Sequence, residues 1–200
     1  PISEAGGPHL DRECLAAGAL SLGADVPFFL QPGVKLARGR GEQLEPMCMP
    51  RLELVLIRPE EALSTKEVYA VYDIVAGSES GAEFVDRCAW AAEAWRQLER
   101  SWVEGLLDRE TVAARVGSLA RNDLERAAYR MVTDLYVRRV ALEATGARVA
   151  MMTGSGPTMV GVYTSRAAAE QAAEELADSG YDVEVTGTKA MDVEAKRSLP

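Results

Sequence analysis

The sequence is poor in the residues that build disulfide frameworks, zinc sites and histidine-based catalytic centres. Its 200 residues include three cysteines and one histidine, His9. Cys14, Cys48 and Cys88 are odd in number, far apart and without Cys-x-x-Cys spacing, so we expect neither a disulfide scaffold nor a zinc site. A single histidine also argues against a histidine metal cluster or a Ser-His-Asp triad. This cysteine usage fits a reducing, cytoplasmic environment.

Long apolar runs and an excess of positive charge are also missing. No window approaches about 18 consecutive apolar residues, and no basic stretch precedes an apolar one at the start, so we expect neither a membrane span nor a signal peptide. Lys and Arg number 22 against 31 Asp and Glu, a net charge of −9. We therefore expect no nucleic-acid partner, although backbone N–H groups can still bind a nucleotide phosphate locally.

What is present is the composition of a soluble globular chain, 48% apolar and 26% charged, with strand and helix patterns in succession. Period-2 and apolar runs predict strands at 34–38, 52–57, 149–152, 159–163 and 181–186, the second of them central and buried on both faces. Helical spacing predicts helices at 11–22, 65–75, 84–102 and 108–116. Three more are expected: one capped by Asn122, one that carries Leu135 and ends near Gly146, and one capped by Ser165. This order predicts an α+β sandwich with helices on one face of a mainly antiparallel sheet.

One carboxylate, Asp25, lies where the chain is predicted to change direction. Gly23 should end a helix through a left-handed turn, and Asp11 is a plausible N-cap for that helix. Pro27 should keep Val26 out of the α region and start an extended run. An aspartate that only caps a turn explains this spacing as well as a functional carboxylate does.

Aromatic residues are few, 6% of the chain, and the tryptophans gather on one predicted helix. Apolar residues recur there at steps of four and three, namely Phe84, Cys88, Ala91, Trp95, Leu98 and Trp102. A tryptophan stripe can form a ligand platform, but this periodicity favours packing against the core.

A glycine-rich loop, Thr153-Gly154-Ser155-Gly156, joins two predicted strands. No Lys-Ser/Thr follows it, so it is not a Walker A loop. Alternate glycines allow φ above zero and bring successive N–H groups close to an anion, but a tight strand connection needs the same residues. Upstream of it, Asn122 is expected to cap a helix with Asp123 and Glu125 at its positive end, which suffices to explain these residues.

Five segments, in this order along the chain, resemble motifs of one branch of the GHMP kinases, the 4-diphosphocytidyl-2-C-methyl-D-erythritol kinases. They are Gly-Ala-Asp-Val-Pro-Phe-Phe at 23–29, Gly-Arg-Gly-Glu at 39–42, Ser-Thr-Lys-Glu-Val-Tyr at 64–69, Asn-Asp-Leu-Glu at 122–125 and Met-Thr-Gly-Ser-Gly-Pro-Thr at 152–158. Each motif alone is a weak signal, but their common order is a strong one.

The resemblance implies a GHMP-kinase-like fold whose C-terminal domain is a ferredoxin-like α/β sandwich. We expect residues 1–33 to be a remnant of the N-terminal catalytic lobe, 34–190 the C-terminal domain and 191–200 a tail. The implied activity is ATP-dependent phosphorylation of the 2-hydroxyl of 4-diphosphocytidyl-2-C-methyl-D-erythritol in the non-mevalonate isoprenoid pathway. ATP and Mg²⁺ are implied by the family, and the partner is a small-molecule substrate in the cytoplasm.

The resemblance also implies roles for five residues. Asp25 corresponds to the catalytic base; because the transition state of phosphoryl transfer is loose, its carboxylate would chiefly orient the hydroxyl. Tyr69 corresponds to an aromatic residue that stacks on cytosine, and its position one step off the apolar helix face favours stacking over core packing. Gly154, Ser155 and Gly156 correspond to the floor of the active site, across a narrow gap from Asp25.

The chain departs from the family pattern at its start. The N-terminal lysine, the nucleotide-facing strands and the Gly-Gly-Gly-Ser-Ser loop of relatives are not in this sequence. We therefore expect negligible kinase turnover from these 200 residues alone, and no ATP-binding residue or metal ligand is assigned. Arg40, Glu42 and Lys66 receive no role.

Two other functions stay open. One is another GHMP small-molecule kinase of the homoserine or mevalonate type, against which Phe28, Phe29 and the segment 64–69 argue. The other is a non-catalytic α+β module that binds a ligand or a partner.

Overall fold

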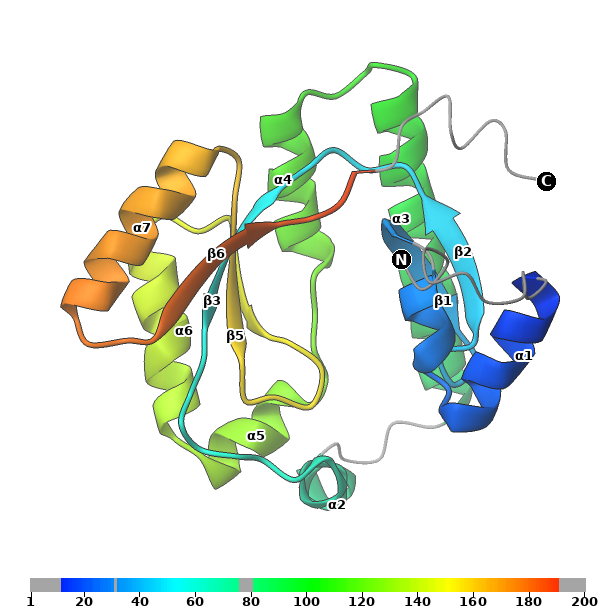
Figure 1. Ribbon diagram of the computed structural model, residues 1–200, viewed down its shortest axis with the longest axis horizontal. Coiled ribbons are helices and arrows are strands. Elements are labelled where there is room, and N and C mark those ends of the chain that lie inside the picture. Colours follow the sequence, from blue (N-terminus) through cyan, green and yellow to red (C-terminus); the bar gives the residue numbers. More distant parts are fainter. Residues whose placement is uncertain (1–11, 31, 76–80, 191–200) are drawn as a thin grey trace, which may run out of the picture. The chain divides into compact units, whose positions relative to one another are not determined.

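The structure, a computed structural model, describes residues 12–30, 32–75 and 81–190 (Figure 1). The chain forms two compact units. Unit 1 comprises residues 1–48 and 189–200, and unit 2 comprises residues 49–188. The boundary predicted between residues 33 and 34 concerns the family lobes and stays a prediction. The chain divides into the two compact units between residues 48 and 49 and again between 188 and 189.

The part of unit 1 that the structure describes contains two helices followed by a β-hairpin. The elements are α1 (Arg12–Leu22), the 3₁₀-helix η2 (Val26–Leu30), β1 (Val34–Arg38) and β2 (Gln43–Met47). The strands β1 and β2 pair antiparallel, and Gly39 and Gly41 take positive φ values of 69° and 115° in the turn between them. Strand β1 is confirmed, whereas β2 was not predicted because it contains Pro46, which a two-stranded hairpin tolerates since both of its strands are edges.

The bend around Asp25 differs from the prediction in two respects. Gly23 does end α1, but its φ is not in the left-handed region. The segment after Asp25 is not extended, because Val26–Leu30 forms η2 and the Phe28 N–H donates to the Asp25 carbonyl at 3.2 Å. Proline suits the first turn of a helix, where its φ fits and its missing N–H is not needed. The predicted cap Asp11 lies outside the described residues.

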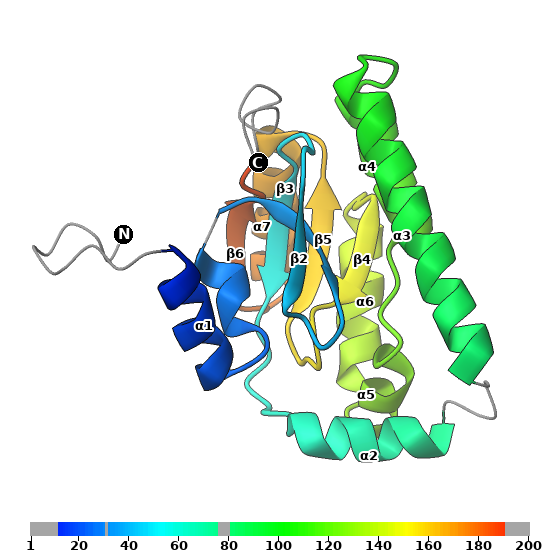
Figure 2. The same ribbon diagram turned by 90° about the vertical axis from the view of Figure 1, so that its right-hand side faces the viewer.

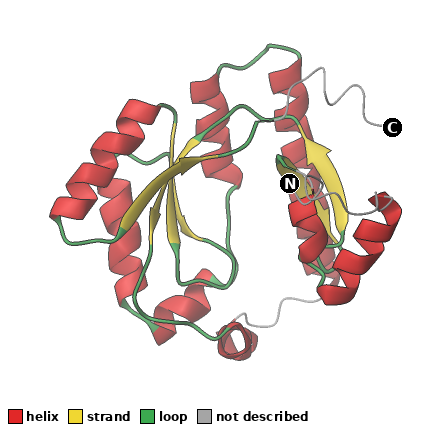
Figure 3. Ribbon diagram, in the orientation of Figure 1, coloured by secondary structure: helices red, strands yellow, loops and turns green. Residues whose placement is uncertain are grey.

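Unit 2 is built on one antiparallel sheet. Its strands are β3 (Glu53–Ile57), β4 (Val149–Met152), β5 (Met159–Tyr163) and β6 (Val183–Gly187), in the spatial order β4-β5-β3-β6. Every neighbouring pair is antiparallel, and Val55 lies between Gly161 and Val185. This confirms the predicted α+β fold with a ferredoxin-like strand order and a central strand at β3 (Figure 3).

Six helices of the described chain belong to unit 2: α2 (Thr65–Val75), α3 (Gly81–Val103), α4 (Arg109–Leu119), α5 (Glu125–Met131), α6 (Asp134–Ala144) and α7 (Arg166–Asp178). Helices α6 and α7 cover one sheet face, and α2 runs beneath α5, which it contacts (Figure 2). The main core includes Val55, Ile57, Leu135, Leu142, Met152, Met159 and Leu176. None of the helices in the described ranges has the length and hydropathy to cross a membrane.

The prediction that helices lie on one sheet face only was wrong. Helix α4 packs against β4, and a second cluster containing Ala113 joins Leu52, Val149 and Val162 on the face opposite the main core. Strand β3 accordingly alternates between buried and half-buried positions and is not uniformly buried. The cause is α4, which covers only part of this second face.

Local signals predicted most helix ends correctly. Helix α2 has the predicted bounds, and the Glu67 N–H donates to Ser64 Oγ at 3.4 Å. Asp108 caps α4 and Ser165 caps α7 through their side chains. The tryptophan-bearing helix α3 is buried mainly towards its C-terminal end: Leu98 is buried, whereas Phe84, at the other end of the same stripe, is 44% exposed.

Candidate functional site

The glycine loop, residues 153–158, connects β4 to β5. Gly154 and Gly156 have φ values of 53° and 87°, which confirms the conformation predicted for them. The Gly156 N–H donates to the Thr153 carbonyl at 2.9 Å, and the Thr153 N–H donates to the Thr158 carbonyl at 2.9 Å. A Cβ atom on Gly156 would lie 2.5 Å from Met152 Sδ. This position therefore requires glycine for its conformation and for the space beside it.

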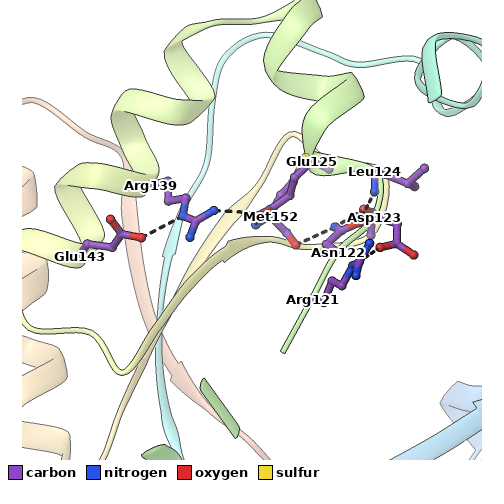
Figure 4. A network of polar contacts seen from close by, with 9 residues as sticks. Arg121, Asn122, Asp123, Leu124, Glu125, Arg139, Glu143 and Met152 are labelled. Atoms are coloured by element: carbon purple, nitrogen blue, oxygen red, sulfur yellow. Dashed lines mark hydrogen bonds and ion pairs between the residues drawn. The ribbon is translucent and has the colours of Figure 1, made fainter. Parts of the chain in front are cut away.

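The side chain of Asn122 reaches this loop, which corrects its predicted role as a simple helix cap (Figure 4). Helix α5 begins at Glu125 with Leu124 at the N-cap, and Asn122 Oδ1 accepts from the Leu124 N–H at 3.0 Å. Asn122 Nδ2 donates to the Met152 carbonyl at 2.9 Å and to the Gly154 carbonyl at 2.7 Å. Sequence reasoning missed these contacts because their acceptors lie some thirty residues further along the chain.

Glu125 binds the same strand end through a second contact. Its Oε1 accepts from the Met152 N–H at 2.7 Å, and its Oε2 lies 3.6 Å from Arg139 Nη1. Arg139 also binds Glu143, with 2.9 Å between Nε and Oε1 (Figure 4). Asn122, before α5, and Glu125, at its first position, therefore bind the end of β4 through their side chains.

Helix α2 meets the glycine loop from another direction. Thr65, in the first turn of α2, has its Oγ1 2.8 Å from Ser155 Oγ. Tyr69 follows one turn later, and residues four apart share a helix face. Val68 is fully buried and anchors the helix, whereas Tyr69 is 52% exposed. The predicted cytosine platform and the predicted loop thus belong to directly connected elements of unit 2.

Asp25 is exposed, at the junction of α1 and η2 in unit 1. Its carboxylate lies close to Gly41, where an added Cβ would be 2.7 Å from Asp25 Oδ1. The turn at residues 39–42, for which the sequence predicted no role, therefore lies next to this carboxylate. The glycine loop belongs to the other unit, and its predicted pairing with Asp25 stays a prediction.

A hollow of about 440 Å³ lies beside β4 and is lined in part by Asn122 and Glu125. Its lining also includes Arg121, Arg139 and Arg148. Each of these arginines pairs with a carboxylate, namely Asp123, Glu143 and Glu110 in turn, so the hollow carries little uncompensated positive charge. Within the described ranges, no three His, Cys, Asp or Glu side chains gather as a metal site. We therefore assign no residue to Mg²⁺.

The sequence of the chain is similar to that of known proteins. Residues 102–182 match the model of the GHMP kinases C-terminal domain. The chain is 35% identical over 163 residues to 4-diphosphocytidyl-2-C-methyl-D-erythritol kinase of Anaeromyxobacter dehalogenans, covering 82% of this chain and 46% of that protein. The chain spans about half the length of the curated relatives it matches.

Two solved structures resemble the chain over most of its length. A crystal structure of 4-(cytidine 5'-diphospho)-2C-methyl-D-erythritol kinase matches with a TM-score of 0.65 and 28% identity, covering 92% of this chain and 59% of the other. Homoserine kinase from Cytophaga hutchinsonii matches with a TM-score of 0.64 at 15% identity, over 92% of this chain and 59% of that one, a likeness of fold alone.

Proposed function

Because the chain belongs to the GHMP kinase superfamily, in the branch of the 4-diphosphocytidyl-2-C-methyl-D-erythritol kinases, we propose that the protein is an ATP-dependent kinase that phosphorylates the 2-hydroxyl of 4-diphosphocytidyl-2-C-methyl-D-erythritol. This reaction belongs to the non-mevalonate route to isoprenoids. The observation that carries the proposal is 35% identity to a kinase of that name across 82% of the chain.

In this proposal Asp25 orients the hydroxyl that receives the γ-phosphoryl group of ATP. Transfer through a loose transition state needs positioning more than early proton removal, so an exposed carboxylate held at a bend suits the task. The proton of the acceptor hydroxyl leaves late in the phosphoryl transfer and passes to the Asp25 carboxylate. Mg²⁺ would neutralise charge on the transferring group.

Two elements of unit 2 would hold the substrate. The half-exposed ring of Tyr69 is available to stack on cytosine. The positive φ angles of Gly154 and Gly156 let the N–H groups of Gly154 and Ser155 approach a phosphate or the erythritol group without interference from a Cβ atom.

A comparison of substrates tests the proposal against other GHMP kinases. The full-length protein is assayed with ATP and, in turn, the cytidylyl methylerythritol, homoserine and mevalonate, and ³¹P NMR locates the new phosphate. We expect kcat/KM for the cytidylyl substrate to exceed the others by at least about 100-fold. A preference for homoserine or mevalonate would refute the assignment.

Calorimetry separates the kinase from a non-catalytic module. The 200-residue chain is titrated separately with ATP and with the cytidylyl substrate. Binding of the cytidylyl substrate supports the proposal, and binding of neither ligand favours the module.

A further inference from the structure

We propose that Asn122 is a positioning residue for phosphoryl transfer, with Glu125 as its partner: together their side chains clamp the start of the glycine loop. The inference rests on the proposed function, because it explains how that loop holds its shape in the reaction. It concerns the network drawn in Figure 4, which none of the roles above uses.

The first step is that Asn122 uses both of its amide hydrogens and its amide oxygen in hydrogen bonds. Its two amide hydrogens go to the carbonyls of Met152 and Gly154, and its oxygen accepts from the Leu124 N–H. The opposite orientation of the amide would set its oxygen against two carbonyl oxygens. The side chain is therefore held in one orientation, and the two carbonyls it binds flank Thr153, where β4 ends and the loop begins.

The second step is that the clamp closes an otherwise open strand edge. Strand β4 is the outermost strand of the sheet, with β5 on one side only. An edge strand normally leaves its outward backbone groups to water. At Met152 the N–H instead binds Glu125, and the C=O binds Asn122. Met152 itself is fully buried, so the strand end is held by its side chain as well as its backbone.

The third step connects the clamp to the chemistry. Gly154 is bound by Asn122 and the next residue, Ser155, by Thr65 of α2, so the loop is fixed at successive residues from two elements. If the Asn122 contacts are lost, the loop N–H groups move relative to the acceptor hydroxyl. A displacement of about 1 Å in such a group can cost about 100-fold in rate. Cytosine stacking on Tyr69 needs neither carbonyl, so substrate affinity should fall much less than kcat.

The test uses Asn122→Asp in the full-length protein, because this near-isosteric change removes both donors and faces two carbonyl oxygens with a carboxylate. We expect kcat to fall about 10- to 1000-fold with KM for the cytidylyl substrate within about threefold. Hydrogen exchange at the amides of Thr153 and Gly156, which donate within the loop, should become faster. A merely structural residue would lower stability without this split between kcat and KM.

Asp123→Asn is the matched control. Asp123 is the neighbouring residue, and this substitution is the reverse of Asn122→Asp. The Asp123 carboxylate pairs with Arg87 and Arg121. We expect kcat and loop exchange of this variant to stay within about threefold of the wild type, whatever it loses in stability.

A second pair keeps the test decisive if Asn122→Asp does not fold. Both Glu125→Gln and Glu125→Met lose the charge that faces Arg139, but only Gln keeps an oxygen that can accept from the Met152 N–H. We expect the Gln variant to retain kcat within about threefold and the Met variant to lose at least about tenfold.

Three results would overturn the proposal: wild-type kcat in Asn122→Asp, lost kcat with unchanged loop exchange, or equal losses in the Gln and Met variants. A wild-type protein without turnover of the cytidylyl substrate would refute the proposed function instead. The exchange measurements would still report whether the clamp exists.

Discussion

Asp25 combines an exposed carboxylate with a backbone position set by α1 and η2, and Gly41 lies directly against it. If the carboxylate orients the acceptor hydroxyl, Asp25→Asn in the full-length protein should lower kcat about 10²- to 10⁴-fold, because the amide cannot accept the proton. The fold should change little. Steady-state kinetics and thermal melting measure both, with Asp178→Asn, an exposed change on α7, as the control. Activity within threefold of the wild type would remove Asp25 from the mechanism.

The surroundings of Tyr129 predict that the stability of the fold depends on pH. Its hydroxyl is buried and has no hydrogen-bond partner among the residues that the structure describes. Burial, and then the nearby charge of Glu125, raise the pKa of Tyr129 to about 12. The folded state therefore keeps this proton up to a higher pH than the unfolded chain, where tyrosine ionises near a pKa of about 10. The free energy of unfolding should fall as the pH rises from about 10 towards 12.

Tyr129→Phe tests this assignment. At pH 7 the variant should lie within about 1 kcal/mol of the wild type or be more stable, because the lost hydroxyl had no partner. Between pH 9 and 11 its unfolding free energy, from urea titrations, should fall less than that of the wild type. Tyr136→Phe, at a ring that is 55% exposed, is the control. The same decline in wild type and Tyr129→Phe would contradict the assignment.

Residue-level prediction from sequence succeeded where the physical cause is local. The glycines of the loop were identified because positive φ is a property of single residues, and both angles agree. The contacts of Asn122 and Gly41 could not be predicted, because each depends on a partner brought near by folding. The Asn-Asp-Leu-Glu motif at 122–125 was the one signal that pointed to this region, and a helix cap explained it too easily.

Helix α2 was predicted correctly from the sequence, and it carries Tyr69, the proposed cytosine platform. Its bounds followed from a capping box and helical spacing, signals that lie within the helix itself. Strand β2 and helix η2 show the opposite case. Both contain a proline, and proline is compatible with an edge strand or a first helical turn as well as with irregular chain.

Tyr69→Ala tests the proposed role of α2. Loss of a stacked base is worth about 1–3 kcal/mol, so affinity for a cytidine nucleotide should fall about 5- to 150-fold. Calorimetric titration measures it, and far-UV circular dichroism checks that α2 persists. Tyr136→Ala, at 55% exposure against 52% for Tyr69, is the matched control and should bind normally. Unchanged affinity in Tyr69→Ala would exclude stacking.

At the scale of the whole molecule, stability should reside in the main core of unit 2. Leu135 is fully buried there, whereas Leu106 is 69% exposed. Leu135→Ala should lower the free energy of unfolding by about 2–5 kcal/mol, and Leu106→Ala by less than about 0.5 kcal/mol. Urea titration measures both. Similar losses in the two variants would show that the stabilising core lies elsewhere.

The sequence predicted the fold class and the central strand because strand and helix periods repeat over many residues. It could not predict that α4 covers part of the second sheet face or that the chain divides into compact units after residue 48. Both depend on which apolar surfaces meet after folding, and a pattern within one element carries no such information.

The central proposal is that Asp25 orients the substrate 2-hydroxyl that receives the phosphoryl group. A crystal structure of the full-length protein with the cytidylyl methylerythritol and a non-hydrolysable ATP analogue tests it most directly. We expect an Asp25 carboxylate oxygen within about 3.2 Å of the substrate 2-hydroxyl and the loop N–H groups on the opposite side of the substrate. A substrate bound elsewhere, or an Asp25 side chain directed away from that hydroxyl, would contradict the account.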